Sequence, residues 1–178
     1  MPRPPRSQSP ARPPAGPAPA DPDAAPASAS IPAAPAGHEI LVRRHLAWGW
    51  WSLAVFTTLG LVLEAAHGLK LGWYLDVTAA TRRLSFTLAH AHGTLLGVVH
   101  IAFALTLGRI QLSELAVARA SFALRAVTVL LPLGFLLGGF AFYGGDPGLA
   151  IALVPPSGAL LVVALVLIAR AVSSRPRG

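Results

Sequence analysis

Residues 84–107 read LSFTLAHAHGTLLGVVHIAFALTL, and this stretch decides the fold. It contains no Asp, Glu, Lys or Arg. Its length is close to the roughly 20 residues that an α-helix needs to cross a hydrocarbon core of about 30 Å. Buried helices of soluble proteins are usually shorter and carry a polar face. The stretch therefore predicts a transmembrane helix that carries three histidines.

Three further apolar runs accompany this stretch, at residues 46–67, 126–143 and 149–169. The segments between consecutive runs are short, and the last of them, 144–148, is a turn of Gly, Asp and Pro. Short connections force neighbouring helices to run antiparallel. The sequence therefore predicts an all-α fold, an integral membrane up-down bundle of four helices that occupies residues 38–172.

The two ends of the chain have a different composition. Residues 1–37 are mostly Pro and Ala, and they cannot bury enough apolar surface to offset chain entropy. We expect a disordered N-terminal tail there and a short basic tail at residues 173–178. Prolines stand where the apolar core of a signal peptide would begin, which argues against a signal peptide.

The overall composition narrows the class of protein. The chain is 54% hydrophobic and 12% charged, whereas soluble domains carry roughly 25% charged residues. Its formal net charge is +7, but the basic residues flank the apolar runs and form no stripe with interleaved aromatic residues. We therefore expect a lipid bilayer as the partner, and no nucleic acid. Cysteine is absent, which excludes disulfides and thiolate ligands.

The distribution of Lys and Arg predicts the orientation of the bundle. One side would carry eight of these residues: Arg43, Arg44, Arg109, Arg119, Arg125, Arg170, Arg175 and Arg177. The other side would carry three: Lys70, Arg82 and Arg83. Because basic loops stay on the cytoplasmic side, we expect a multi-pass protein of the cell membrane with both termini in the cytoplasm.

Five ionisable side chains lie inside the predicted spans, where such groups are costly and often functional. Glu64 and His67 are three residues apart, so they share one face of the first helix. The second helix runs antiparallel to the first, which brings His90 and His92 to a similar depth in the outer half, although the two histidines point to different neighbours. His100 lies about 15 Å deeper than His90, so it cannot join the same single-ion site.

These residue types suggest a metal or haem site. Neutral imidazole and carboxylate groups are ligands for Zn, Cu or Fe, which makes Glu64, His67, His90 and His92 candidate metal ligands. Histidines on facing helices can also ligate haem iron or relay protons. Alternatively, each polar side chain forms a hydrogen bond across the bundle and fixes helix register.

The segment Ala89–Val99 contains HAHGTLLG, from His90 to Gly97. It resembles the HAHxxLLG segment of small bacterial membrane proteins related to haem–copper oxidase catalytic subunits and of NnrS-like proteins. Histidines on the membrane helices of such proteins bind haem or copper. The resemblance implies that His90 and His92 are haem or metal ligands, and it implies nothing for Glu64, His67 or His100.

Three hypotheses for the function remain open. The first is a multi-pass membrane protein that binds haem or a transition metal through intramembrane histidines. The second is a non-catalytic membrane subunit or assembly protein, with a membrane-protein partner, whose histidines only pack helices. The third is a small transporter that forms a homo-oligomer. No phosphate-binding loop and no nucleophile–base pair is evident, so the sequence favours a protein that is not an enzyme.

Overall fold

The structure is a computed structural model that describes residues 36–76, 78, 80–109, 113–141 and 143–174. The predicted disordered tail lies almost wholly outside these residues, and so does most of the predicted basic C-terminal tail. Nothing in the structure therefore tests either prediction.

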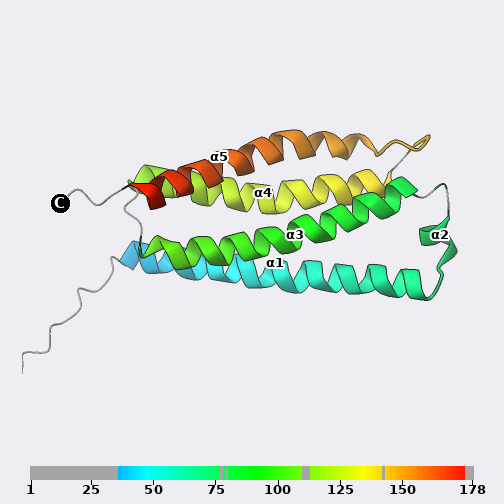
Figure 1. The fold of residues 1–178 in the computed structure, drawn as a ribbon, viewed down its shortest axis with the longest axis horizontal. Coiled ribbons are helices and arrows are strands. Elements are labelled where there is room, and N and C mark those ends of the chain that lie inside the picture. The colour runs from blue at the N-terminus through cyan, green and yellow to red at the C-terminus, as the bar shows by residue number, and fades with distance from the viewer. Residues whose placement is uncertain (1–35, 77, 79, 110–112, 142, 175–178) are drawn as a thin grey trace, which may run out of the picture. The chain divides into compact units, whose positions relative to one another are not determined.

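Four long helices dominate the described chain (Figure 1). They are α1 (Ala36–Gly68), α3 (Ala80–Leu107), α4 (Glu114–Phe140) and α5 (Val154–Ser173). A single turn, α2 (Gly72–Leu75), follows α1, and a 3-10 helix, η2 (Leu149–Leu153), leads into α5. The described residues contain no β-strand, and the all-α four-helix prediction is confirmed.

The long helices pack as a row in the order α1, α3, α4, α5 (Figure 1). Each helix runs antiparallel to the next, as the up-down prediction requires. Within the described residues, α1 makes a minor contact with α4 and none of comparable size with α5. The central helices α3 and α4 consequently bury a larger share of their side chains than the edge helices α1 and α5.

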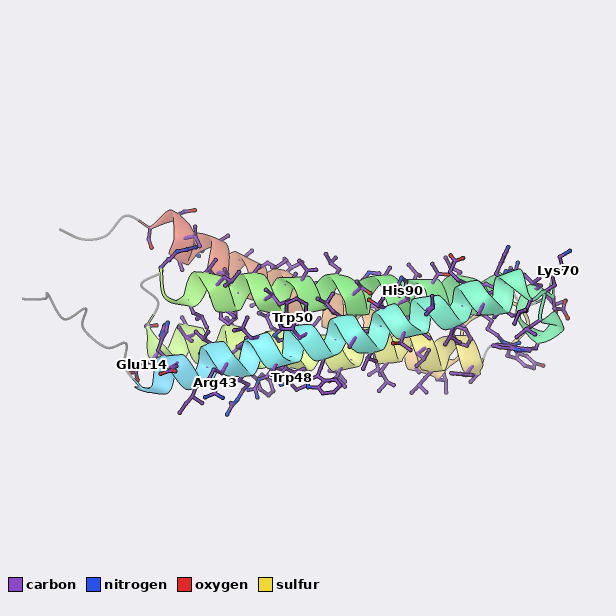
Figure 2. The ribbon with its side chains drawn as sticks, turned by 90° about the horizontal axis from the view of Figure 1, so that it is seen from below. Arg43, Trp48, Trp50, Lys70, His90 and Glu114 are labelled. Atoms are coloured by element: carbon purple, nitrogen blue, oxygen red, sulfur yellow. The ribbon has the colours of Figure 1, made fainter. Side chains whose placement is uncertain are left out.

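Four helical segments are long and apolar enough to cross a membrane: Gly37–Gly68, Ala80–Leu107, Glu114–Phe140 and Leu149–Ser173. The architecture is therefore compatible with a multi-pass membrane protein. Basic residues occur at both ends of the helices, with Arg43 at one end and Lys70 at the other (Figure 2).

Helix α4 begins well before the apolar run predicted at residues 126–143. The side chain of Ser113 accepts a hydrogen bond from the backbone N–H of Ala116 and caps the helix. Ala120 and Leu124 are then buried against Phe103 and Leu107 of α3. Burial of this early face explains why the helix extends beyond the run that hydropathy marks.

The fourth predicted run, 149–169, changes helix type along its length. It starts as the 3-10 helix η2 and becomes α-helical at Val154. Pro155 and Pro156 fall in the first turn of α5, where a backbone N–H would have no intrahelical partner anyway. The pair therefore starts the α-helix and does not interrupt it.

Small residues bring α1 and α3 into close contact. A Cβ atom added at Gly49 would lie 2.8 Å from the carbonyl oxygen of Gly97, which leaves no room for a side chain. One turn away, the ring of Phe56 lies directly over Gly93. The backbones of α1 and α3 therefore approach each other as small residues allow in membrane helices.

The connection between α1 and α3 is tied to the start of α3. The Arg83 guanidinium donates hydrogen bonds to the backbone oxygens of Tyr74 (3.1 Å) and Asp76 (2.8 Å). Hydrogen bonds from the backbone N–H and hydroxyl of Thr78 lower the pKa of the exposed Asp76 carboxyl. These contacts fix the short helix α2, whose Tyr74 is buried beside the pocket described next.

Candidate functional site

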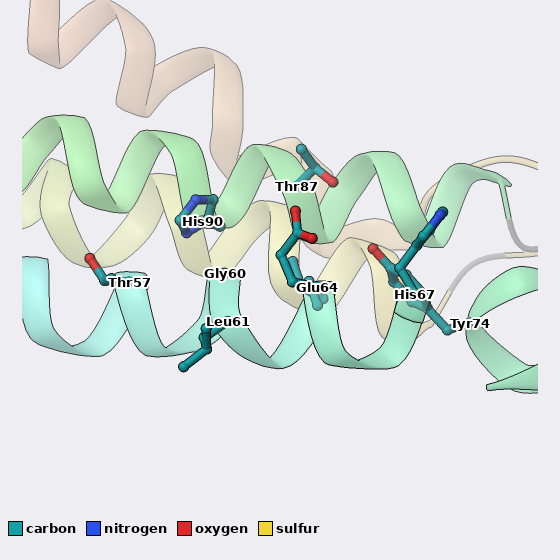
Figure 3. Close-up of a pocket in the computed structure, with 9 residues that line it drawn as sticks. Thr57, Gly60, Leu61, Glu64, His67, Tyr74, Thr87 and His90 are labelled. Carbon is teal, nitrogen blue, oxygen red and sulfur yellow. The ribbon is translucent and has the colours of Figure 1, made fainter. Parts of the chain in front are cut away.

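A pocket of about 560 Å³ lies between α1 and α3, near the α2 end of the bundle (Figure 3). Its polar lining consists of Thr57, Glu64, His67, Tyr74, Thr87 and His90. Three of the four predicted metal ligands, Glu64, His67 and His90, therefore line one pocket. Their convergence follows from helical spacing along α1 and from the antiparallel pairing of α1 with α3.

The ring of His90 is held in a fixed position between the two helices. It lies over Gly60, where an added Cβ would come within 2.4 Å of its Cε1 atom. Its Nδ1 atom lies 2.6 Å from the carbonyl oxygen of Phe56. Because a carbonyl can only accept, Nδ1 carries the proton and donates it. In the neutral ring, Nε2 is then an unprotonated acceptor, which is the state a metal ligand requires.

Glu64 and His67 come from the last turns of α1 and are both exposed on the surface of the described chain. Glu64 extends from α1 toward α3 (Figure 3). The pocket thus brings the half-buried imidazole of His90 together with an exposed carboxylate and a second, exposed imidazole.

His92 does not join this pocket, contrary to the predicted four-residue metal site. Its Nδ1 donates to the carbonyl oxygen of Leu88 at 2.8 Å, and its ring stacks on Phe135 of α4. Residues two apart on a helix point about 200° away from each other, so His90 and His92 face different helices. They cannot both ligate one iron atom from these positions.

The remaining candidates do not form a closed cage for a bare ion. Among the described residues, no group of three His, Asp or Glu side chains is close enough to hold one metal ion. A metal site that combines Glu64, His67, His90 and His92 is therefore not assembled. The physical reason is the helical rotation that turns His92 toward α4.

A second cluster of polar side chains, which sequence reasoning missed, lies deep in the bundle. His45 of α1 and His100 of α3 are both completely buried, and their Nδ1 atoms are 2.6 Å apart. The Nε2 atom of His45 lies 2.8 Å from the Ser121 hydroxyl, and that of His100 lies 2.9 Å from the Thr128 hydroxyl. The pair thus links α1, α3 and α4.

The donor and acceptor of each of these hydrogen bonds can be assigned by starting from Thr128. Thr128 donates its hydroxyl proton to the carbonyl of Leu124, so it accepts from Nε2 of His100. His100 Nδ1 must then accept from Nδ1–H of His45, and His45 Nε2 accepts from the Ser121 hydroxyl. Both rings are neutral in this arrangement, and all four ring nitrogens have a partner.

The buried pair leaves no room for haem between its rings. Haem iron needs a gap of about 4 Å between its two axial nitrogens, since each Fe–N bond resembles other metal–imidazole bonds of about 2 Å. Gly49 and Gly97, one turn from His45 and three residues from His100, hold α1 and α3 in backbone contact. The pair is therefore an interhelical hydrogen bond that holds α1 against α3.

Two features of the sequence are consistent with this buried histidine pair. His45 precedes the first apolar run by one residue, and Gly49 lies one helical turn after it. Ser121 and Thr128 are seven residues apart, so they share one face of α4. Hydropathy alone does not indicate the cluster, because the first predicted run begins at Leu46 and so excludes His45.

Neither a protein-family model, nor a curated protein, nor a solved structure matches this chain. The fold and the pocket by themselves define its class, an all-α chain of four apolar helices that is compatible with a multi-pass membrane protein.

Proposed function

We propose that this chain is a multi-pass membrane protein that binds a metal-bearing cofactor of the haem type in the pocket between α1 and α3. One observation carries the proposal: His90 lines a pocket with Glu64 and His67 while its Nδ1 is tied to a backbone carbonyl. In the neutral ring, that bond leaves Nε2 as the unprotonated nitrogen. Metal-binding histidines usually have such a partner on the other ring nitrogen.

The size of the pocket favours a chelated metal over a bare ion. A volume of about 560 Å³ falls in the range of small-molecule and cofactor sites, which is about 300–1,000 Å³. The described side chains do not offer three ligands for a bare ion. A macrocycle supplies its own equatorial nitrogens, so it needs only one or two axial ligands from the protein. His90 is suited to be one of them.

The experiment is haem titration of detergent-purified protein, read as the Soret band in an absorption spectrum, with metal analysis beside it. His90→Ala should abolish binding. His92→Ala is a matched control on the same helix and should keep it, because His92 faces Phe135 outside the pocket. Near-stoichiometric haem in both the wild type and the His90→Ala variant would contradict the proposal.

A second candidate function is a non-catalytic membrane subunit whose histidines only pack helices. The buried pair His45 and His100 favours it, because every ring nitrogen there is satisfied within the bundle. A protein that stays colourless and metal-free after expression with haem and metals supplied would favour this candidate. Co-purification of a stoichiometric membrane partner would then be the positive test.

A further inference from the structure

An apolar groove of about 640 Å³ lies between α1 and α4, and it is distinct from the polar pocket. Trp48, Trp51 and Val55 line it from α1, and Val129, Pro132 and Leu133 line it from α4. Polar atoms contribute little to its walls. The groove exists because α1 and α4 both pack on α3 but make only a minor contact with each other.

One end of this groove is basic. Arg44, Trp48, Trp51 and Val55 follow one another at spacings of four, three and four residues, so they share one face of α1. On α4, Arg125 precedes Val129 and Pro132 at the same spacings. Because α1 and α4 run in the same direction, both arginines extend the groove at the same end.

Ser121 of α4 relates the two arginines, because its hydroxyl contacts His45, the residue that follows Arg44. Both are close enough to the buried ring of His45 to act on it electrostatically. The Nε atom of Arg125 donates to the carbonyl oxygen of Ser121 at 3.3 Å. Within the described part of the chain, neither Arg44 nor Arg125 forms an ion pair with a carboxylate. Among the residues that the structure describes, the two positive charges at this end of the groove therefore have no carboxylate partner.

The dimensions of the groove suit one leaflet of a bilayer. From Ala47 to Leu59 it follows α1 for about 18 Å, and half of a hydrocarbon core is about 15 Å. Arg44 lies three residues before Ala47 on α1, and Arg125 lies three residues before Thr128 on α4, so each lies about 5 Å beyond the apolar lining along its helix axis. The basic end is thus at the depth of lipid phosphates when the apolar part is at the depth of acyl chains.

We infer that the groove between α1 and α4 binds an anionic phospholipid, with its phosphate at Arg44 and Arg125 and an acyl chain along Trp48, Trp51 and Val129. Arginine binds phosphate oxygens with paired N–H groups, and basic sites between membrane helices select anionic head groups. The apolar walls add contact area for the chain. A zwitterionic lipid would satisfy the walls but not the two charges.

The test is a quenching measurement with the groove residues Trp48 and Trp51 as the only tryptophans, after Trp50 and Trp73 are changed to Phe. Phosphatidylglycerol or phosphatidylcholine with brominated acyl chains is titrated into lipid-depleted protein in detergent. Both tryptophans line the groove, so their fluorescence reports contact with the acyl chain. We expect phosphatidylglycerol to quench at a mole fraction about tenfold lower than phosphatidylcholine.

Charge-matched variants separate the groove from general surface charge. Arg44→Gln/Arg125→Gln should remove the preference for phosphatidylglycerol. Arg43→Gln/Arg119→Gln removes the same charge at the same end but from other helix faces, and it should leave the preference intact. Val129→Phe should fill the groove without adding a tryptophan and weaken quenching by both lipids, with circular dichroism as the check that each variant stays helical.

Three results would overturn the inference. The first is equal quenching by the two lipids, and the second is equal loss of preference in both arginine variants. The third is a homodimer that shields Trp48 and Trp51 from either lipid and dissociates on Val129→Phe, because the groove would then hold a second copy of the chain.

Discussion

At the scale of single residues, the strongest constraint is the buried pair His45 and His100. Each ring nitrogen has a partner, so burial leaves no unsatisfied donor or acceptor in the pair. Because all four ring nitrogens are already hydrogen-bonded, the pair stabilises the bundle and does not bind a ligand. A ligand could reach either ring only by breaking the hydrogen bond between the rings.

Removal of one ring should therefore lower the free energy of unfolding by more than the loss of its own packing contacts, because buried partners are left without a hydrogen bond. We expect His45→Ala to lower the free energy of unfolding by about 1–3 kcal/mol, since it leaves His100 Nδ1 and the Ser121 hydroxyl without partners in a buried site. Unfolding in detergent by a denaturing surfactant measures the change. A double-mutant cycle with His100→Ala should give a coupling energy of about 0.5–2 kcal/mol.

His92→Ala is the control for this cycle. The polar contact of His92 lies within its own helix, to the carbonyl of Leu88, so no interhelical hydrogen bond is lost. We expect a smaller effect and no coupling to His45. A cycle of His45 and His100 that shows no coupling would mean that the two rings do not share a hydrogen bond.

At the scale of secondary-structure elements, the contact of α1 with α3 positions both the polar pocket and the buried pair. Gly49 and Gly97 bring the two helices together near the pair, and Gly60 accommodates the ring of His90 at the pocket. A wider separation would move His45 away from His100 and Glu64 away from His90. The two clusters of polar residues thus depend on the same interface.

Gly49→Ala should test this dependence. Its Cβ would meet the carbonyl oxygen of Gly97, a backbone atom that can move only with its helix. We expect a net loss of stability of about 1–3 kcal/mol, as in other overpacked sites. Thermal or surfactant unfolding in detergent gives the value.

Gly158→Ala is the matched control on α5, because an added Cβ there meets no atom within 4 Å. It should be neutral or stabilising, since Ala is a better helix former than Gly by about 1 kcal/mol. If both substitutions had the same effect, close approach at Gly49 would not be what holds α1 to α3.

At the scale of the whole bundle, basic residues predict which end of the helices faces the cytoplasm. The end with Arg43, Arg119 and Arg125 carries more Lys and Arg than the end with Lys70. The chain has no cysteine, so single introduced thiols report topology without background. Asp146→Cys in the turn before η2 and Ser174→Cys after α5 lie at opposite ends of a span.

In intact cells, a membrane-impermeant maleimide should label Asp146→Cys and leave Ser174→Cys unlabelled until the membrane is permeabilised. The reason is that loops rich in Lys and Arg stay on the cytoplasmic side. The opposite labelling pattern would invert the proposed orientation. Labelling of both sites in intact cells would argue against a membrane span between them.

The arrangement of the helices in a row leaves apolar surface exposed on the two edge helices. The edge helices α1 and α5 expose large apolar side chains, among them Trp50, Trp51 and Val162. In water these surfaces would associate, whereas in a bilayer lipid covers them. The open row therefore fits the membrane assignment, and it creates the groove between α1 and α4.

The sequence by itself determined the four helices and part of the polar pocket. Hydropathy over about 20 residues is a local property, so each long helix was visible in one run of the chain. Helical spacing placed Glu64 beside His67, and antiparallel pairing brought His90 to their depth. These steps need only the geometry of one helix and the direction of the next.

Only the tertiary structure decided which helices touch and how each is rotated. Helical spacing already separates His92 from His90, but packing decided that His92 meets Phe135 of α4 and that His45 pairs with His100. The row order left α1 and α4 apart and so formed the groove beside Arg44. Contacts between helices depend on packing at residues far apart in the chain, such as Gly49 with Gly97, and no local pattern contains that information.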